Sequence, residues 1–211
     1  MTESIPPRDG WITIAPKQSL VMTPELASDW MRQRKALREI RGNVIAASVE
    51  IEFALDVLIR EIIFPKEWTL GKQLEGEVEK GRQVFDSCVS KSGALSLSNK
   101  INILRKLLSE KQVINDAEQK QLFRQLDEIR SVRNRFAHTT ISFEPSSDLQ
   151  TTRLKAYIVD SGIKTYLDND FFDKLNQLYS ECMVRVENVT RKLQGVPQQP
   201  LPVVAGGSNG G

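Results

Sequence analysis

The only histidine of the 211-residue chain, His138, closes the arginine-rich segment RSVRNRFAH. Arginine holds a phosphate through its fixed charge and paired N–H donors, and histidine takes up and releases protons near neutral pH. Arg133, Asn134 and His138 therefore have the side chains needed to bind a phosphodiester and to move protons during its cleavage. The alternative is a charged helix end whose last residue happens to be histidine.

A metal or a cofactor is not expected from the composition. The chain has one histidine and two cysteines, and the cysteines, Cys88 and Cys182, lie far apart in the sequence. This spacing matches neither a disulfide framework nor a zinc site. The formal net charge is only +2, so any contact with RNA must be local and cannot depend on a strongly basic surface. We expect a cytoplasmic protein in a reducing setting.

No part of the sequence is expected to enter a membrane. The first residues, MTESIPPRDGWITIAPKQ, lack the basic segment and the apolar core of a secretory signal. The longest apolar-rich stretch, NVIAASVEIEFALDVLIREIIF, is interrupted by charged residues that a bilayer-spanning helix would hardly carry.

Helices are expected to position the motif. Apolar residues keep helical spacing over residues 24–64; Pro24 suits the first turn, Gly42 could bend or split the helix, and Pro65 ends it. Further helices are expected within LEGEVEKGRQVFDSCV and LSNKINILRKLL, and over residues 115–138 and 168–195. The expected caps are Ser96 or Ser98, Asn115 or Asp116, and Asp168 or Asp170, with Gly195 as the final stop.

Strands are expected between the last two helices. TTISFEP and RLKAYIVDSGIKTYL have a β-rich composition, and DSG in the second segment predicts a hairpin turn. The fold class is therefore mainly α, a helix bundle with a small β-hairpin before the C-terminal helix. We expect an extended arm over residues 1–23, one helical domain over residues 24–195 and a disordered Pro/Gly-rich tail over residues 196–211.

One arginine of the motif falls where an apolar residue is expected. The apolar arc of the helix over residues 115–138 contains Leu122, Leu126, Ile129, Val132 and Phe136. Arg133 lies within this arc, and its permanent charge requires a carboxylate, a phosphate or a water-filled cleft. Glu52, at the edge of the apolar arc of the first helix, could form a structural pair with it. Alternatively, Arg133 binds the scissile phosphate and Glu52 holds Arg133 in place. Two other acids of the first helix, Glu50 and Asp56, are expected at the surface.

Further basic residues could guide RNA to this cleft. Arg130 and Asn134 flank the apolar arc, whereas Arg124 and Arg135 point towards solvent. The segment MRQRKALREIR places three more arginines on one helical face, namely Arg34, Arg38 and Arg41. In one interpretation Arg41 and Arg130 bind the substrate; in the other this is a solvated basic face.

The position of His138 raises a geometric difficulty. It follows Arg133 by five positions, so on an unbroken helix the two side chains diverge by about 140°. They converge only if the helix ends near Ala137 or if two chains share the site. The β-branched residues directly after His138 are typical of such a helix end.

RNRFAH, which contains Arg133, Asn134 and His138, resembles the Arg–polar–x3–His signature of the HEPN superfamily. The order of the expected helices is similar as well: the long LREIRGNVIAASVEIEFALDVLIREIIF, the shorter LSNKINILRKLL, and the motif at the end of a later helix. The first of these also resembles the helix that opens the mannitol operon repressor group, a HEPN-like family. The similarity covers roughly residues 36–140 and, more loosely, the last expected helix. The chain departs from the HEPN pattern in the long segment after the first helix and in the hairpin after the motif.

The resemblance implies an α-helical domain that dimerises and cleaves RNA without a metal ion, as endoribonucleases of toxin–antitoxin and phage-defence systems do. Arg133 would neutralise the phosphate, and Asn134 would orient a reacting group. His138 would exchange protons with the ribose 2′-OH or the leaving 5′-oxygen, which gives a 2′,3′-cyclic phosphate and a 5′-hydroxyl. Because the chain has one histidine, a symmetric homodimer that brings both copies of His138 to one cleft would supply the second proton-transfer group. An antitoxin or a regulatory protein is a further expected partner.

Two alternatives remain. The chain could be a non-catalytic HEPN-like regulator or protein-interaction module, related to the mannitol operon repressor group, that retains the motif for structure or ligand binding. It could also be a plain helical dimerisation domain in which the pair of Arg133 and Glu52 is structural.

Overall fold

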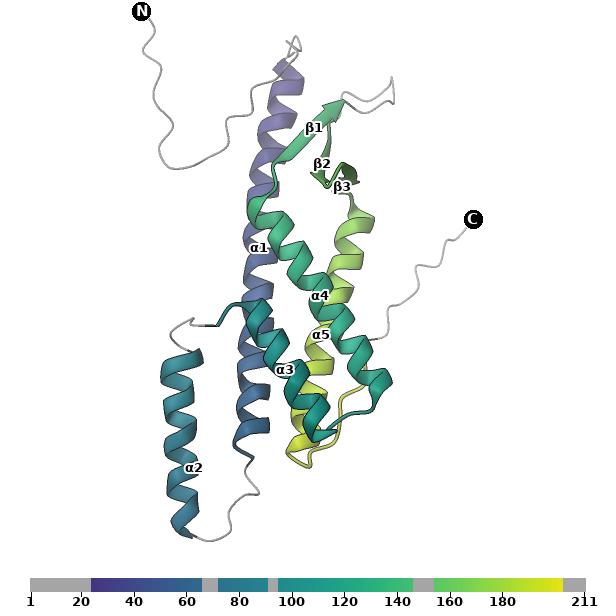
Figure 1. Cartoon of the computed structure of the whole chain (residues 1–211). Coiled ribbons are helices and arrows are strands. Elements are labelled where there is room, and N and C mark those ends of the chain that lie inside the picture. The colour runs from purple at the N-terminus through teal and green to yellow at the C-terminus, as the bar shows by residue number, and fades with distance from the viewer. Residues whose placement is uncertain (1–23, 66–71, 91–94, 146–153, 203–211) are drawn as a thin grey trace, which may run out of the picture.

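The computed structural model describes residues 24–65, 72–90, 95–145 and 154–202, which form a helix bundle with a small sheet at one end (Figure 1). The first helices are α1 (Pro24–Ile63) and α2 (Lys72–Phe85), and α2 continues as the π-helical turn η2 (Asp86–Ser90). They are followed by α3 (Leu97–Lys111), α4 (Asp116–His138), β1 (Ile141–Pro145), β2 (Leu154–Asp160), β3 (Ile163–Tyr166) and α5 (Asn169–Leu193). The expected fold class, mainly α with a small sheet before the last helix, is confirmed.

Three of the helices begin at the predicted caps. The Ser96 hydroxyl accepts from a backbone N–H of the first turn of α3, and the Asp168 carboxylate does the same for α5. Asn115 and Glu118 form a reciprocal capping box at the start of α4. By contrast, α1 is one continuous helix that Gly42 does not split.

Helix α1 is the centre of the bundle, because it contacts α3, α4 and α5. Helix α2 lies to one side of these helices in Figure 1. It is held at the C-terminal end of α1 by the edge-to-face rings of Phe64 and Phe85 and by an ion pair between Arg82 and Glu61.

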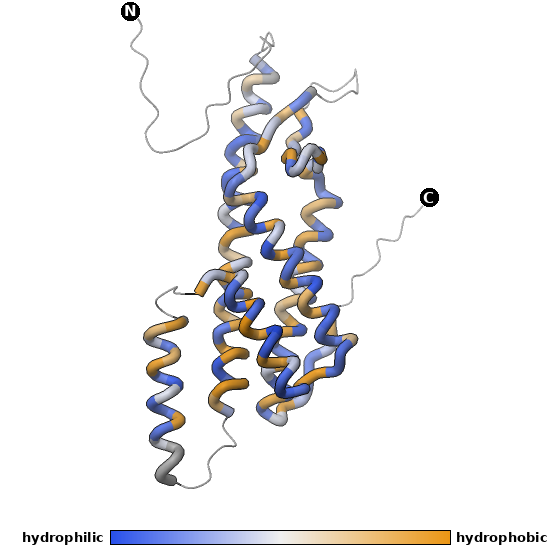
Figure 2. Tube along the Cα trace, in the orientation of Figure 1, coloured by the Kyte–Doolittle hydropathy of each residue, from blue (hydrophilic) through white to orange (hydrophobic). Residues whose placement is uncertain are grey.

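The apolar core consists of two clusters of unequal size. The larger cluster joins α1, α3, α4 and α5 and includes Leu55, Ile101, Leu126 and Cys182, none of which is exposed. The smaller cluster lies nearer the sheet and contains Val44, Val132, Phe136 and Leu175. Hydrophilic colours dominate the part of α1 beside the sheet in Figure 2, in keeping with the smaller cluster there. The motif in the last turns of α4 therefore lies beside the smaller cluster.

The sheet is antiparallel in the order β1–β2–β3. The predicted DSG turn is confirmed, since Asp160 pairs with Ile163 across Ser161 and Gly162. Ser161 and Gly162 have φ values of 51° and 81°, the left-handed conformations that a tight hairpin turn requires. This turn brings the end of β2 close to the end of α4.

The arm expected over residues 1–23 lies outside the described residues. Of the expected tail, residues 196–202 are described and follow α5, where the Asn188 side chain bonds the backbone of Gln199. Within the part of the chain that the structure describes, none of the helices has both the length and the apolar character that crossing a membrane requires.

Candidate functional site

Helix α4 carries the whole motif on one rigid element. It continues through His138, and the backbone N–H of Thr139 donates to the carbonyl of Arg135 to close the last turn. The helix therefore does not end before His138, so Arg133 and His138 diverge by about 140°. Within one chain the structure does not bring these two side chains together. The expected helix end near Ala137 is therefore not found, because α4 continues through His138.

Arg133 points towards α1, where its guanidinium lies 3.2 Å from the Glu52 carboxylate. The pair of Arg133 and Glu52 that was expected from the sequence is thus present. The Arg133 side chain keeps 31% of its surface exposed, whereas Glu52 keeps 16%. Arg133 is therefore held by Glu52 and is still partly accessible to solvent.

The Glu52 carboxylate belongs to a larger buried group of charges. The Lys100 ammonium of α3 lies 2.8 Å from Asp56 and 4.0 Å from Glu52. The side chains of Asp56 and Lys100 are each only 4% exposed. The four charged residues, Asp56, Lys100, Glu52 and Arg133, run from the interior towards the surface and are called the charge chain below.

The charge chain corrects one prediction and adds a residue. Asp56 was expected at the surface, but α3 covers it and Lys100 neutralises it, as a buried carboxylate requires. Glu50 is exposed, as expected. A sequence signal for Lys100 existed, because it lies three residues after Leu97 and four before Leu104 on the apolar stripe of α3.

Asn134 and His138 line an open pocket of about 540 Å³ on the other side of α4. Its lining comes from α3, α4 and the end of β2 and consists of Ser98, Arg130, Ser131, Asn134, Arg135, His138, Thr139 and Asp160. Asn134 and His138 are exposed. Two arginines in an open polar pocket can bind an anion. A histidine beside them can exchange a proton with solvent or with the bound group.

Both arginines of this pocket are already engaged with other side chains. Arg130 donates to the Ser98 hydroxyl and pairs with Asp127 at 3.1 Å. Arg135 was expected to point into solvent, but it is half-buried and lies 3.9 Å from Asp160. The hairpin turn, which brings Asp160 to the end of α4, is the reason for this difference.

Arg41, the other candidate substrate-binding arginine, lies beside the end of α4. Its guanidinium donates to the Thr139 carbonyl at 2.9 Å. A cation at this position also interacts favourably with the negative end of the helix dipole. Arg41 is half-buried, so it fixes the backbone next to His138 and is not part of a fully solvated basic face.

Tyr179 of α5 is another titratable group close to the motif. Its hydroxyl is 2.8 Å from the Ser48 hydroxyl, and burial raises its pKa above the ordinary value for tyrosine. The tyrosine therefore stays protonated near neutral pH and does not act as a base. The described residues contain no cluster of three histidine, cysteine or acidic side chains placed to hold a metal ion.

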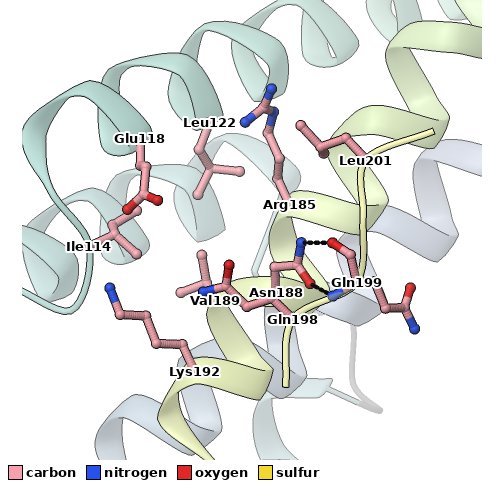
Figure 3. A pocket seen from close by; sticks show the side chains of 10 residues that line it. All are labelled: Ile114, Glu118, Leu122, Arg185, Asn188, Val189, Lys192, Gln198, Gln199 and Leu201. Atoms are coloured by element: carbon pink, nitrogen blue, oxygen red, sulfur yellow. Dashed lines mark hydrogen bonds between the residues drawn. The ribbon is translucent and has the colours of Figure 1, made fainter. Parts of the chain in front are cut away.

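A second cavity, of about 190 Å³, lies at the opposite end of α4, between α4, α5 and residues 198–201 (Figure 3). Arg185, Asn188 and Lys192 enter it from α5, and Glu118 from α4. Figure 3 shows the two hydrogen bonds, of 2.8 Å and 2.7 Å, by which the Asn188 amide holds the backbone of Gln199. Nothing in this cavity belongs to the motif.

Comparison of the chain with protein-family models, with curated proteins and with solved structures found no match.

Proposed function

We propose that this chain is a metal-independent endoribonuclease of the HEPN type that acts as a homodimer. The observation that carries the proposal is the contrast within the motif. Glu52 fixes Arg133 from behind while leaving it partly open, and Asn134 and His138 are exposed in the same turns of the same helix. An arginine held in a defined position and an accessible histidine are what phosphodiester cleavage through the 2′-OH requires.

In the proposed reaction, His138 accepts the proton of the ribose 2′-OH while the 2′-oxygen attacks phosphorus. The bond between phosphorus and the 5′-oxygen breaks, and the leaving oxygen receives a proton from the His138 of the second copy. Arg133 neutralises the charge that gathers on the non-bridging oxygens, and Asn134 donates a hydrogen bond to one of them. The products are a 2′,3′-cyclic phosphate and a 5′-hydroxyl, and DNA is not cleaved because it lacks the 2′-OH.

Arg130 and Arg41 have supporting parts in this proposal. Arg130 lines the pocket beside Asn134 and guides the RNA backbone by its charge. Arg41 acts through its bond to Thr139 and keeps the end of α4, and therefore His138, in a fixed position. A toxin or phage-defence effector of this kind would be restrained by an antitoxin or a regulatory protein.

The proposal is tested by incubating purified protein with total RNA in the presence of EDTA. Wild type should cleave and leave 2′,3′-cyclic phosphate ends, and His138→Ala should lower the rate by about 10² to 10⁴-fold, the usual contribution of an acid–base group. Arg124→Ala is the matched control, because Arg124 is an exposed arginine of the same helix outside the pocket. Intact RNA with wild type, or equal cleavage by His138→Ala, would exclude the proposal.

A non-catalytic HEPN-like regulator or interaction module is the second candidate. One observation favours it: Arg133 already has a carboxylate partner, so the motif has a structural use without RNA. In that case Arg133→Ala should lower the stability of the fold, while the RNA profile is the same with wild type, with His138→Ala and with no protein.

A further inference from the structure

The segment that follows α5 turns back along that helix and lines the cavity at the far end of α4 (Figure 3). Gly195, whose φ is 67°, ends the helix in the left-handed conformation that favours glycine. Pro197, Pro200 and Pro202 cannot continue a helix, and each favours an extended conformation for the residue before it. Residues 196–202 are called the tail segment below.

Side chains of α5 hold the tail segment by its backbone. The Arg191 guanidinium donates to the Pro197 carbonyl at 3.1 Å. The Asn188 amide donates to the Gln199 carbonyl at 2.8 Å and accepts from the Gln199 N–H at 2.7 Å. The N–H and C=O of one residue point to the same side in an extended chain. Asn188 therefore recognises an extended backbone and no particular side chain, as an edge strand does when it accepts a peptide.

The tail segment does not fill the space beneath it. A cavity of about 190 Å³ remains between the segment, α4 and α5. Ile114, Leu122 and Val189 line it and are buried. Leu201 also lines the cavity but is 39% exposed. A residue that reached further into the cavity would bury more apolar surface than Leu201 does.

The polar lining of the cavity has a positive charge that the tail segment does not neutralise. Arg185 and Lys192 enter from α5, and Glu118 enters from α4. The Glu118 carboxylate already accepts from the backbone N–H of Asn115 in the capping box. The Nε atom of Arg185 is buried and has no hydrogen-bond partner within the described residues. Since no residue of the tail segment is charged, an acidic side chain would match this lining better.

We infer that this groove between α4 and α5 binds an extended, proline-containing peptide of another protein, with an acidic side chain at the position of Gln198. The tail segment is then an intramolecular competitor for the groove. Asn188 offers contacts that any extended segment can make, and the charge of the lining selects an acidic one. A site made for the tail segment alone would not need two cations that the segment leaves unneutralised. The inference does not rest on RNA cleavage, because the groove and the motif lie at opposite ends of α4.

The inference is tested by fluorescence polarisation with two labelled heptapeptides and full-length protein. One peptide has the sequence of residues 196–202, and the other carries Gln198→Glu. The protein carries Gln199→Pro, which removes the N–H that donates to Asn188 and weakens the hold on its own tail segment. Both peptides should bind this variant about three- to tenfold more tightly than wild type, whose tail segment competes at a millimolar effective concentration.

Asn188 carries the backbone recognition. Asn188→Ala, made in the Gln199→Pro background, should weaken binding of both peptides by at least about tenfold, because two hydrogen bonds are lost. Asn176→Ala is the matched control, since Asn176 is an exposed asparagine of α5 outside the groove, and it should leave the affinity unchanged. Thermal melts of both variants separate lost binding from lost folding.

The charge of the lining gives a second readout that does not alter Asn188. The Gln198→Glu peptide should bind about two- to fivefold more tightly than the parent peptide, and Lys192→Met, at an exposed position, should remove most of that gain. No gain would overturn the acidic partner, and equal affinities for wild type and Gln199→Pro would overturn the competition by the tail segment. Affinities weaker than about 1 mM for both peptides, or equal affinities for Asn188→Ala and Asn176→Ala, would overturn the groove itself.

Discussion

The middle of α1 covers charged residues on one side and exposes apolar residues on the other. On its inward side, which faces α3, Glu52 and Asp56 lie beside Lys100, with Asp56 only 3% exposed. On its outward side, Val49 and Phe53 are each more than half exposed. The rest of the buried face is apolar, as in an ordinary amphipathic helix, and includes Ile51, Leu55 and Leu58. The inward charges are therefore a local exception that needs the partners Lys100 and Arg133.

The inward charges end at the motif. The charge chain runs from Asp56 to Arg133, so it holds the arginine of the motif from the side of α1.

The largest effect is expected on the inward side. Lys100→Met leaves Asp56 buried and unpaired, and breaking a buried ion pair in this way should lower the free energy of unfolding by about 3 to 5 kcal/mol. Urea unfolding at fixed protein concentration measures this difference. Lys106→Met changes an exposed lysine of the same helix and should stay within about 0.5 kcal/mol of wild type.

A double variant sharpens the same point. Asp56→Leu combined with Lys100→Met replaces both charges by apolar groups and should recover most of the lost stability. If Lys100→Met alone cost less than about 1 kcal/mol, the inward charges would be ordinary surface pairs and the contrast between the two sides would disappear.

A smaller effect is expected at the open end of the charge chain. Arg133→Ala should cost about 1 to 2 kcal/mol, because Glu52 is partly solvated and Lys100 lies 4.0 Å from it. Arg133→Lys keeps the charge and should recover part of that stability but not RNA cleavage, since a lysine lacks the planar paired donors. Equal cleavage rates for wild type and Arg133→Lys would show that the guanidinium geometry does not matter.

The smallest effect is expected on the outward side. Gly42→Ala should raise the free energy of unfolding by up to about 1 kcal/mol, because alanine is the better helix former and a Cβ atom at this position meets nothing within 4 Å. Gly81→Ala is the contrasting control, since its Cβ would come within 2.7 Å of the Phe64 ring. That variant should be destabilised. A loss of stability in Gly42→Ala would mean that Gly42 has an intramolecular role.

The sequence predicted the parts of this fold that depend on local chemistry. Side chains that bond backbone N–H groups a few residues away define the caps at Ser96, Asn115 and Asp168, and a short left-handed turn defines the hairpin. The contact between Glu52 and Arg133 was also accessible, because both residues lie at defined positions on regular helical wheels.

The parts that were missed depend on how separate elements pack. Asp56 was assigned to the surface because its partner, Lys100, comes from a helix whose position on α1 the sequence does not specify. Arg135 was assigned to solvent because the approach of Asp160 depends on where the hairpin folds back. The chemical roles of Arg133, Asn134 and His138 stay predictions, since they depend on a substrate and a second chain.

Cleavage of total RNA by purified protein in the presence of EDTA tests the central claim most directly. Wild type is compared with His138→Ala and with Arg124→Ala, which changes an exposed arginine of the same helix outside the pocket.

Wild type and Arg124→Ala should cleave and leave 2′,3′-cyclic phosphate ends, and His138→Ala should cleave about 10² to 10⁴-fold more slowly. RNA that stays intact with wild type, or equal cleavage rates for wild type and His138→Ala, would contradict the proposed role of the motif.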